Sequence, residues 1–327
     1  MDIERAKTRV FTIKTPEDFE DAAISIFRYQ YENNATYGKF IDLLGININS
    51  INSSAEIPCL PIEFFKTHDI SSLKAQPELI FKSSGTTSGG KSSHPVFSKS
   101  LYETSILKSF NSFYGSPQAY QIFALAPDTS SAPDSSLAYM LDFLIKSSGQ
   151  PEGGFYLNRQ EELSEKIKKN HSKKKIIFGI TYALMDFAEK FSINTENTFV
   201  IETGGMKGRR SELTRQELHD FLKYKFGVSE IQSEYSMCEL MSQAYSKQNG
   251  IFVCPPWMKI VIKEINDPMN SEKTGKSGGI NIIDLANIYT CSFISTKDIG
   301  VVHHDGSFEV LGRYDQSDIR GCSLLLS

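Results

Sequence analysis

The residues from Ser83 to Ser92, with the sequence SSGTTSGGKS, have the composition of a phosphate-binding loop. Glycines allow the backbone amides to turn toward an anion, hydroxyl groups donate hydrogen bonds to it, and Lys91 adds a positive charge. Read from Gly85, the segment matches the Walker pattern Gly-x-x-x-x-Gly-Lys-Ser. The candidate phosphate-binding residues are Ser83, Ser84, Gly85, Thr86, Thr87 and Lys91.

The residues that flank this loop argue against a Walker nucleotide hydrolase or kinase, which remains an alternative. A Walker loop lies between a strand and a helix whose N-terminus faces the phosphates. Residues 78–82 have the apolar character of a strand, but Pro95 follows Lys91 too closely for a helix to begin there. We therefore expect strand, loop, strand. The best strand for a Walker metal-binding aspartate is Ile280–Asp284.

Activation of a carboxylate by ATP is the second chemistry that the loop suits. An anionic oxygen must attack the α-phosphorus of an anionic nucleotide, so the site must neutralise charge, bind a metal ion and hold the adenine and ribose. Candidates follow the loop in a fixed order. They are Gly204 and Gly205 after the apolar run from Thr198, the segment EYSMCE at 234–239, and the segments ISTKDIG at 294–300 and LGRYDQSDIRG at 311–321.

In this order the motifs resemble those of the adenylate-forming superfamily, and most closely the LuxE-type acyl-protein synthetases of bacterial fatty-acid reductase, over roughly residues 60 to 322. The resemblance implies that Gly204 and Gly205 line the adenine pocket and Tyr235 stacks near adenine. It implies that Glu239 is a catalytic residue that binds magnesium, Asp298 accepts hydrogen bonds from the ribose hydroxyls, and Arg313 supplies positive charge. The chain departs from the superfamily pattern at Ser236, Cys238 and Lys297.

The resemblance also implies a reaction. ATP and magnesium would convert a fatty acid to an acyl-adenylate, and Cys322 would accept the acyl group as a thioester for delivery to an acyl-CoA-reductase-like protein. The neighbouring Arg320 would lower the pKa of the Cys322 thiol. The sequence ends six residues after Gly321, so we expect no mobile C-terminal domain with a catalytic lysine. Lys91 and His94 are open candidates for its replacement. An acyl- or aryl-CoA ligase related to phenylacetate-CoA ligase is a further alternative.

The elements that must position these residues follow an α/β pattern. Apolar runs, the first from Tyr120 to Leu125, alternate with helical stretches between about residues 120 and 226, which predicts a mainly parallel sheet covered by helices. Shorter apolar runs after residue 250, among them Tyr289 to Ile294, predict short strands in a smaller, more antiparallel region. The pair Thr15-Pro16, followed by two acidic residues, predicts the start of a helix. We expect a helical N-terminal segment at 1–77, a nucleotide-binding core at 78–250 and a β-rich region at 251–327.

Composition narrows the class of protein further. The net charge of −4 gives no electrostatic reason to expect nucleic acid as a partner. No apolar run reaches the eighteen or so residues of a membrane span, and the N-terminus lacks a signal-peptide pattern. The cytoplasm is the expected compartment. The five cysteines are scattered, which argues against a disulfide framework or a structural zinc site.

Overall fold

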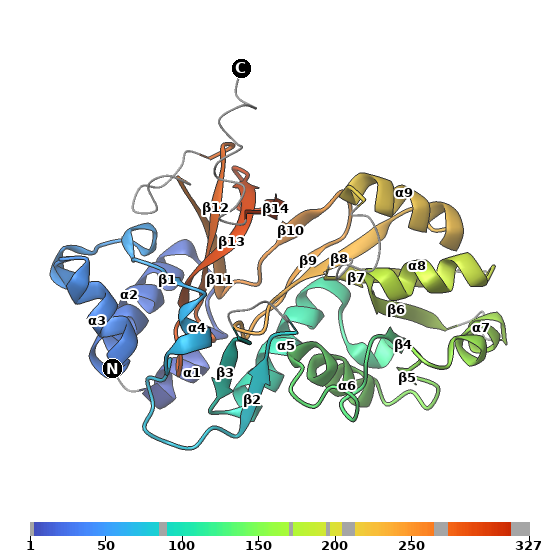
Figure 1. The fold of residues 1–327 in the computed structure, drawn as a ribbon, viewed down its shortest axis with the longest axis horizontal. Helices are drawn as coiled ribbons and strands as arrows, with labels where there is room; N and C mark the ends of the chain where they lie inside the picture. Colours follow the sequence, from blue (N-terminus) through green and yellow to red (C-terminus); the bar gives the residue numbers. More distant parts are fainter. Residues whose placement is uncertain are drawn as a thin grey trace.

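The protein, described here by a computed structural model, is built on a mixed sheet of twelve strands. The structure describes residues 3–84, 90–169, 173–193, 197–204, 213–264 and 274–314. The strands lie in the order β11-β12-β13-β14-β10-β9-β8-β7-β6-β4-β5, with β1 paired to β13, and β2 and β3 form a separate two-stranded sheet (Figure 1). The α/β fold class expected from the sequence is confirmed.

The strand bounds are β1 Leu60–Pro61, β2 Leu79–Lys82, β3 Ser93–Val96, β4 Tyr120–Leu125, β5 Gly154–Phe155, β6 Lys174–Ile180, β7 Thr198–Thr203, β8 Ile231–Tyr235, β9 Ala244–Ser246, β10 Ile251–Val253, β11 Met258–Lys263, β12 Ser277–Asp284, β13 Phe293–Val302 and β14 Phe308–Arg313. The α-helices are α1 Ile3–Val10, α2 Pro16–Asn33, α3 Ala35–Leu43, α4 Phe64–Thr67, α5 Lys99–Tyr114, α6 Ser136–Ser148, α7 Gln160–Lys169, α8 Thr181–Lys190 and α9 Arg215–Phe226. Three short 3-10 helices lie at Ile48–Ser50, Ser54–Glu56 and Pro117–Ala119.

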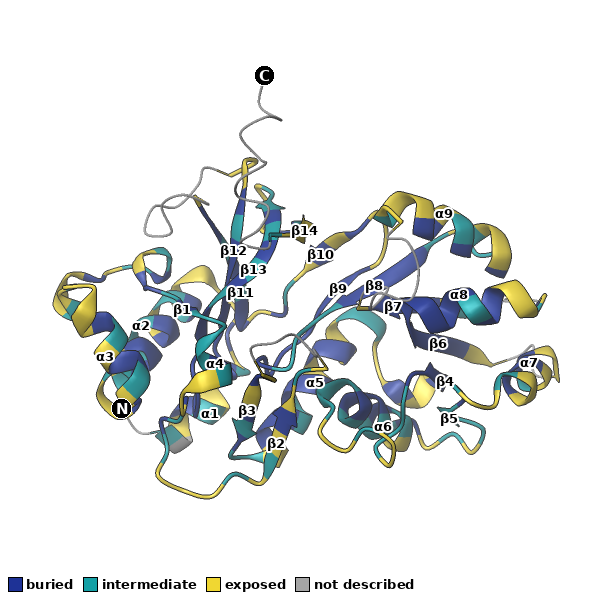
Figure 2. Cartoon of the chain, in the orientation of Figure 1, coloured by how far each residue is buried: buried dark blue, intermediate teal, exposed yellow. Residues whose placement is uncertain are grey.

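Strands β5, β4, β6, β7 and β8 form the parallel part of the sheet. Helices α5 and α6 lie on one side of it and α8 and α9 on the other (Figure 1). Strands β4, β6 and β8 are largely buried on both faces, as Figure 2 shows, and the apolar side chains of the parallel strands divide between two core clusters. Such double burial explains why β4 and β6 are nearly continuous apolar runs rather than alternating ones. The βαβ pattern predicted for this region is confirmed.

From β8 to β11 the neighbouring strands pair antiparallel, as expected for the region after residue 250. One predicted boundary is wrong. The apolar run Tyr289–Ile294 was expected to be a strand throughout, but β13 begins only at Phe293. The residues before it form a buried loop, because the Tyr289 carbonyl accepts from the Ser72 amide at 2.8 Å and the Thr290 carbonyl accepts from the Asn34 side-chain amide at 3.0 Å. These carbonyls are therefore bound by residues outside the sheet and not by a neighbouring strand.

The helix predicted to start at Thr15-Pro16 is confirmed as α2. The Thr15 hydroxyl accepts from the Asp18 amide at 3.1 Å, and the Asp18 carboxylate accepts from the Thr15 amide at 3.2 Å, which is a complete capping box. The buried face of α2 packs on the antiparallel part of the sheet, where the rings of Phe27 and Phe293 meet edge to face at 6.1 Å. The N-terminal helices thus share one core with residues after 250. The domain boundaries at 77 and 250 stay predictions.

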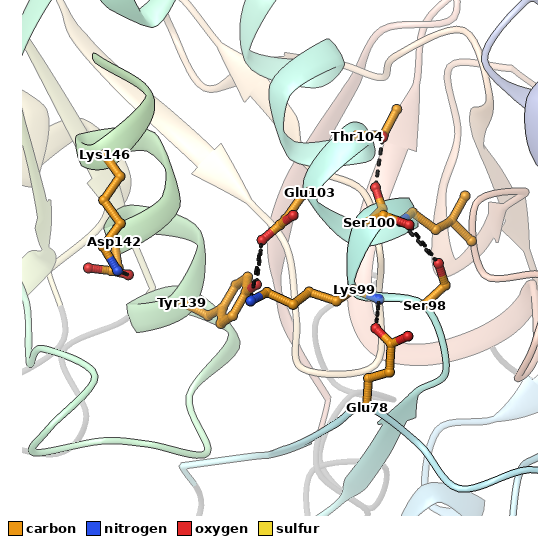
Figure 3. A network of polar contacts seen from close by, with 10 residues as sticks. Glu78, Ser98, Lys99, Ser100, Glu103, Thr104, Tyr139, Asp142 and Lys146 are labelled. Carbon is orange, nitrogen blue, oxygen red and sulfur yellow. Dashed lines mark hydrogen bonds and ion pairs between the residues drawn. The ribbon is translucent and has the colours of Figure 1, made fainter. Parts of the chain in front are cut away.

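The β2–β3 hairpin carries the candidate phosphate loop. Its strands are antiparallel, with Ile80 opposite Pro95, and α5 begins only at Lys99. The loop therefore connects two strands, as the position of Pro95 predicted, and the Walker alternative is wrong. Figure 3 shows how the helix that follows is held: the Lys99 amide donates to Glu78 at 2.7 Å, and the Tyr139 hydroxyl of α6 donates to Glu103 of α5 at 2.7 Å.

Among the described residues, no helix has the length and apolar character needed to cross a membrane.

Candidate active site

The two ends of the phosphate loop are joined by hydrogen bonds. The Ser83 amide donates to the Ser92 carbonyl at 3.1 Å, and the Ser92 amide donates to the Ser83 hydroxyl at 3.0 Å. Ser84 and Lys91 are exposed on either side of this neck. Gly85, Thr86 and Thr87 lie outside the described residues. The described ends of the loop are thus held together, with the exposed cation of Lys91 beside them.

The segment that follows β8 lies against this hairpin. The Ser92 side chain forms a hydrogen bond with the Glu239 carboxylate, and the His94 ring Nδ1 lies 2.8 Å from the Cys238 carbonyl oxygen. On the other side, the Asn287 amide donates to the Glu239 carbonyl at 2.8 Å. Contacts from β3 and from the loop before β13 therefore hold Glu239 beside the phosphate loop.

Glu239 is a buried carboxyl with only 4% of its surface exposed. Burial raises its pKa, while the hydrogen bond from Ser92 and the charges of Arg313 and Lys66 oppose that rise. The carboxyl group of Glu239 therefore lies in a polar site with two cations nearby. Among the described residues, no group of three or more His, Cys, Asp and Glu side chains is arranged to hold a metal ion. A single carboxylate is nevertheless sufficient for magnesium when phosphate oxygens and waters complete its ligands.

Tyr235, Asp298 and Arg313 meet although they lie far apart in the sequence. The Tyr235 hydroxyl donates to Asp298 Oδ2 at 2.7 Å, and Arg313 Nε lies 3.2 Å from Asp298 Oδ1. Burial raises the pKa of Asp298, and the contacts with Tyr235 and Arg313 oppose the rise. The Arg313 side chain is 70% exposed, so it can turn toward a bound ligand at little cost.

A register shift between β13 and β14 produces this meeting. Asp298 is opposite Arg313, but the pairing shifts between Ile299 and Gly300. A side chain at Gly300 would place its Cβ 2.4 Å from the carbonyl oxygen of Glu309, so only glycine fits the irregular pairing. The bulge therefore determines which residue of β14 faces Asp298.

Gly204 ends β7 with a φ of 76°, a conformation that favours glycine. Its carbonyl accepts a hydrogen bond from the Thr181 hydroxyl at 2.6 Å, which ties the ends of β6 and β7 together. Gly205 lies outside the described residues. Because β6, β7 and β8 are parallel, Gly204 and Tyr235 lie at the same edge of the sheet, where α/β folds bind ligands.

Two residues weighed from the sequence have structural roles instead. His94 is fully buried, and burial lowers its pKa to about 4, so at neutral pH it carries no charge that could replace a lysine. Asp284, the Walker candidate, accepts hydrogen bonds from the amides of Met241 and Ser242 at 2.8 and 2.9 Å and is fully buried. Lys91 stays a candidate for a catalytic lysine. Cys322 lies outside the described residues.

Sequence reasoning missed Lys66 and Asn287 and did not single out Ser92, although all three contact or influence Glu239. Ser92 belongs to the phosphate-loop motif, so its hydroxyl was a visible signal. Lys66 and Asn287 stand in segments with no motif, and only the packing of α4 and of the loop before β13 brings them here. Lys297, which departs from the superfamily pattern, forms an ion pair with Glu63 at 2.9 Å.

Solved structures with this fold belong to adenylate-forming ligases. A 2-hydroxyisobutyryl-CoA ligase in complex with 2-HIB-AMP and CoA aligns with a TM-score of 0.69 at 12% identity, over 93% of this chain and 72% of that one. ATP-bound MatB from Rhodopseudomonas palustris aligns with a TM-score of 0.55 at 14% identity, over 73% of this chain. This chain spans about half the length of MatB, 49%. No curated protein matches the chain. The fold is therefore the one that these ligases share.

The family model for "Acyl-protein synthetase, LuxE" matches residues 17–327, nearly the whole sequence. The chain belongs to this family.

Proposed function

We propose that this protein uses ATP to activate a fatty acid as an acyl-adenylate and then carries the acyl group as a thioester on Cys322. The observation that carries the proposal is the meeting of four separated motifs at one edge of the sheet. Ser92 joins the phosphate loop to Glu239, and Tyr235 and Arg313 both contact Asp298. Membership of the acyl-protein synthetase family supports the same reaction.

In the first step an oxygen of the acid's carboxylate attacks the α-phosphorus of ATP, and pyrophosphate leaves. The loop amides and Lys91 would hold the phosphates, and Arg313 would offset the negative charge that gathers there. Asp298, which Tyr235 orients, would accept hydrogen bonds from the ribose hydroxyls. Glu239 would hold magnesium, which neutralises phosphate charge when bound. The bonds from Ser92 to Glu239 would keep this carboxylate beside the loop.

In the second step the Cys322 thiolate attacks the acyl carbonyl carbon, a thioester forms, and AMP leaves. The thiol proton passes to solvent or to a base. Burial raises the pKa of each of the four described cysteines, that of Cys59 to about 12, so none of these thiols is prepared for attack. An acyl-CoA-reductase-like protein would then receive the acyl group.

The test is incubation of the protein with a radiolabelled fatty acid and ATP. We expect AMP and pyrophosphate as products, together with protein-bound label that neutral hydroxylamine releases. Cys322→Ser should lose the label and keep fatty-acid-dependent pyrophosphate exchange, whereas the control Cys238→Ser should keep both. Glu239→Gln should lose the exchange. Release of ADP would refute adenylation, and label that survives Cys322→Ser would refute the acceptor.

A free acyl-CoA product without label on the protein would instead indicate the CoA ligase alternative. That outcome would leave adenylation in place and would remove the acyl-protein step.

A further inference from the structure

Buried polar atoms without partners gather between α5 and the strands β8 and β9. They are the Ser109 hydroxyl and the Tyr114 hydroxyl of α5, the Glu234 Oε1 atom of β8 and the Tyr245 hydroxyl of β9. None of these four atoms has a hydrogen-bond partner within the described part of the chain. Native proteins pair nearly all such groups, with protein, water or ligand, so a set of four in one layer requires an explanation.

The strand register places Glu234 and Tyr245 on one face of the sheet. They are directly opposite each other in the antiparallel β8–β9 pair, so their side chains leave the same face. Helix α5 covers this face, because the Tyr245 ring meets the Tyr114 ring edge to face at 5.3 Å. Ser109 lies one helical turn before Phe113, whose ring also contacts Tyr245 at 5.2 Å. The four groups thus line one polar layer.

Electrostatics agree with this geometry. Burial raises the pKa of Tyr114 and of Tyr245, and the Glu234 carboxylate raises both further, as expected for a negative charge close to the two phenols. Burial in turn raises the pKa of Glu234 to about 7, and the hydroxyls of Ser236 and Thr203 beside it oppose the rise. The Oε2 atom accepts a hydrogen bond from the Thr203 hydroxyl, whereas the Oε1 atom has no hydrogen-bond partner within the described part of the chain.

The polar layer lies at the same end of the strands as the candidate active site. Glu234 directly precedes Tyr235 in β8, and Thr203, which bonds Glu234, directly precedes Gly204. Neighbouring residues of a strand face opposite sides of the sheet, so Glu234 lies on the α5 side and Tyr235 on the other. An acid whose carboxylate lies at this end of the strands and whose chain runs along the α5 side would meet the layer. An unbranched alkyl chain would leave all four polar atoms unpaired. A chain with a hydrogen-bonding substituent would pair some of them.

We propose that the acid activated by this protein carries a hydroxyl or amino group, which donates a hydrogen bond to Glu234 Oε1 and contacts the hydroxyl of Tyr245. This inference rests on the proposed function and narrows its substrate from a plain fatty acid to a hydroxy- or amino-substituted one. Glu234 and Tyr245 act here as specificity-determining residues.

The test is acid-dependent exchange of labelled pyrophosphate into ATP with pure protein. Hexanoate, octanoate and decanoate are each compared with derivatives that carry one hydroxyl or one amino group at successive carbons. We expect at least one substituted acid to exceed its parent acid in kcat/KM on the order of 100-fold, because a site built to bind a polar group discriminates against an analogue that lacks it.

Glu234→Leu should reduce this preference to less than about tenfold, because it removes the acceptor that the substituent would bind. Tyr245→Phe should reduce it by a smaller factor. Ser233→Ala is the matched control, since Ser233 lies on the opposite face of β8, beside His219 of α9, and should leave the preference unchanged. If Glu234→Leu does not fold, Glu234→Gln and Tyr245→Phe decide.

The inference is refuted if the unsubstituted acids exchange at least as well as every substituted one. It is also refuted if the preference survives both Glu234→Leu and Tyr245→Phe, since the layer would then hold only water. If no acid in the panel supports exchange, the proposed function itself is wrong and the inference fails with it.

Discussion

Replacement of Glu234 by glutamine should make the stability of the protein less dependent on pH between pH 5 and 8. Burial raises the pKa of Glu234 from an ordinary value of 4.5 to about 7 in the folded protein. Between these two values the folded protein keeps a proton that the unfolded chain has released, so stability falls as pH rises. The difference of about 2.5 pKa units corresponds to about 3 kcal/mol, lost in full by pH 8.

Glutamine cannot ionise, so Glu234→Gln should gain about 3 kcal/mol relative to wild type on going from pH 4.5 to pH 8. The assay is urea unfolding of both proteins at several pH values, because groups that titrate in both proteins cancel in the difference. Glu161→Gln, a change at an exposed position in α7, is the control and should give the same difference at every pH. If the difference in unfolding free energy between wild type and Glu234→Gln stays constant within about 1 kcal/mol from pH 4.5 to pH 8, Glu234 is not a buried, poorly paired carboxyl.

Three further changes test the site and its supports. Tyr235→Phe removes a hydrogen bond to Asp298 and should raise KM for ATP about tenfold with little change in kcat. An unchanged KM would show that Tyr235 and Asp298 do not bind the nucleotide. Gly300→Ala should lower the free energy of unfolding, measured by thermal unfolding, by about 1–3 kcal/mol, because its Cβ would lie 2.4 Å from a backbone oxygen. Gly312→Ala is the control and should cost less, because no atom lies within 4 Å of its Cβ position. Burial lowers the pKa of His94 from 6.5 to about 4. The free energy of unfolding of the wild type should therefore fall by about 3 kcal/mol as pH drops from 6.5 to below 4. His94→Gln should make the free energy of unfolding, measured with urea, less dependent on pH in this range.

Much of the fold was predictable because local sequence decides it. The capping box at Thr15 begins α2, and Pro95 requires an extended strand after the phosphate loop. Strand β4 matches its predicted apolar run, Tyr120–Leu125, at both ends. The prediction failed at Tyr289, where an apolar run became a buried loop because Ser72 and Asn34 bind the carbonyls of Tyr289 and Thr290. No local pattern announces a hydrogen-bond partner more than two hundred residues away.

Part of the candidate site was likewise predictable from the sequence and part was not. The resemblance of its motifs to those of a known family identified Tyr235, Glu239, Asp298 and Arg313 as a set, and the fold brings Tyr235 and Arg313 into contact with Asp298. It did not identify the contacts of Ser92, Lys66 and Asn287 with the Glu239 region, because these residues stand in separate elements. The sequence also did not show that His94 differs in role from Lys91. Burial, which only the fold defines, lowers the pKa of His94 and makes it a neutral structural residue.

The sequence by itself determined the class of protein and the residues available for its chemistry, because motif order, helix caps and turn residues are local properties. The tertiary structure alone decided which of these residues meet and which atoms remain unpaired. The bulge at Gly300 sets Asp298 against Arg313, and the register of β8 and β9 sets Glu234 against Tyr245 beneath α5. Hydrogen bonding and desolvation depend on distances of a few ångströms between distant segments, and only the packed chain defines those distances.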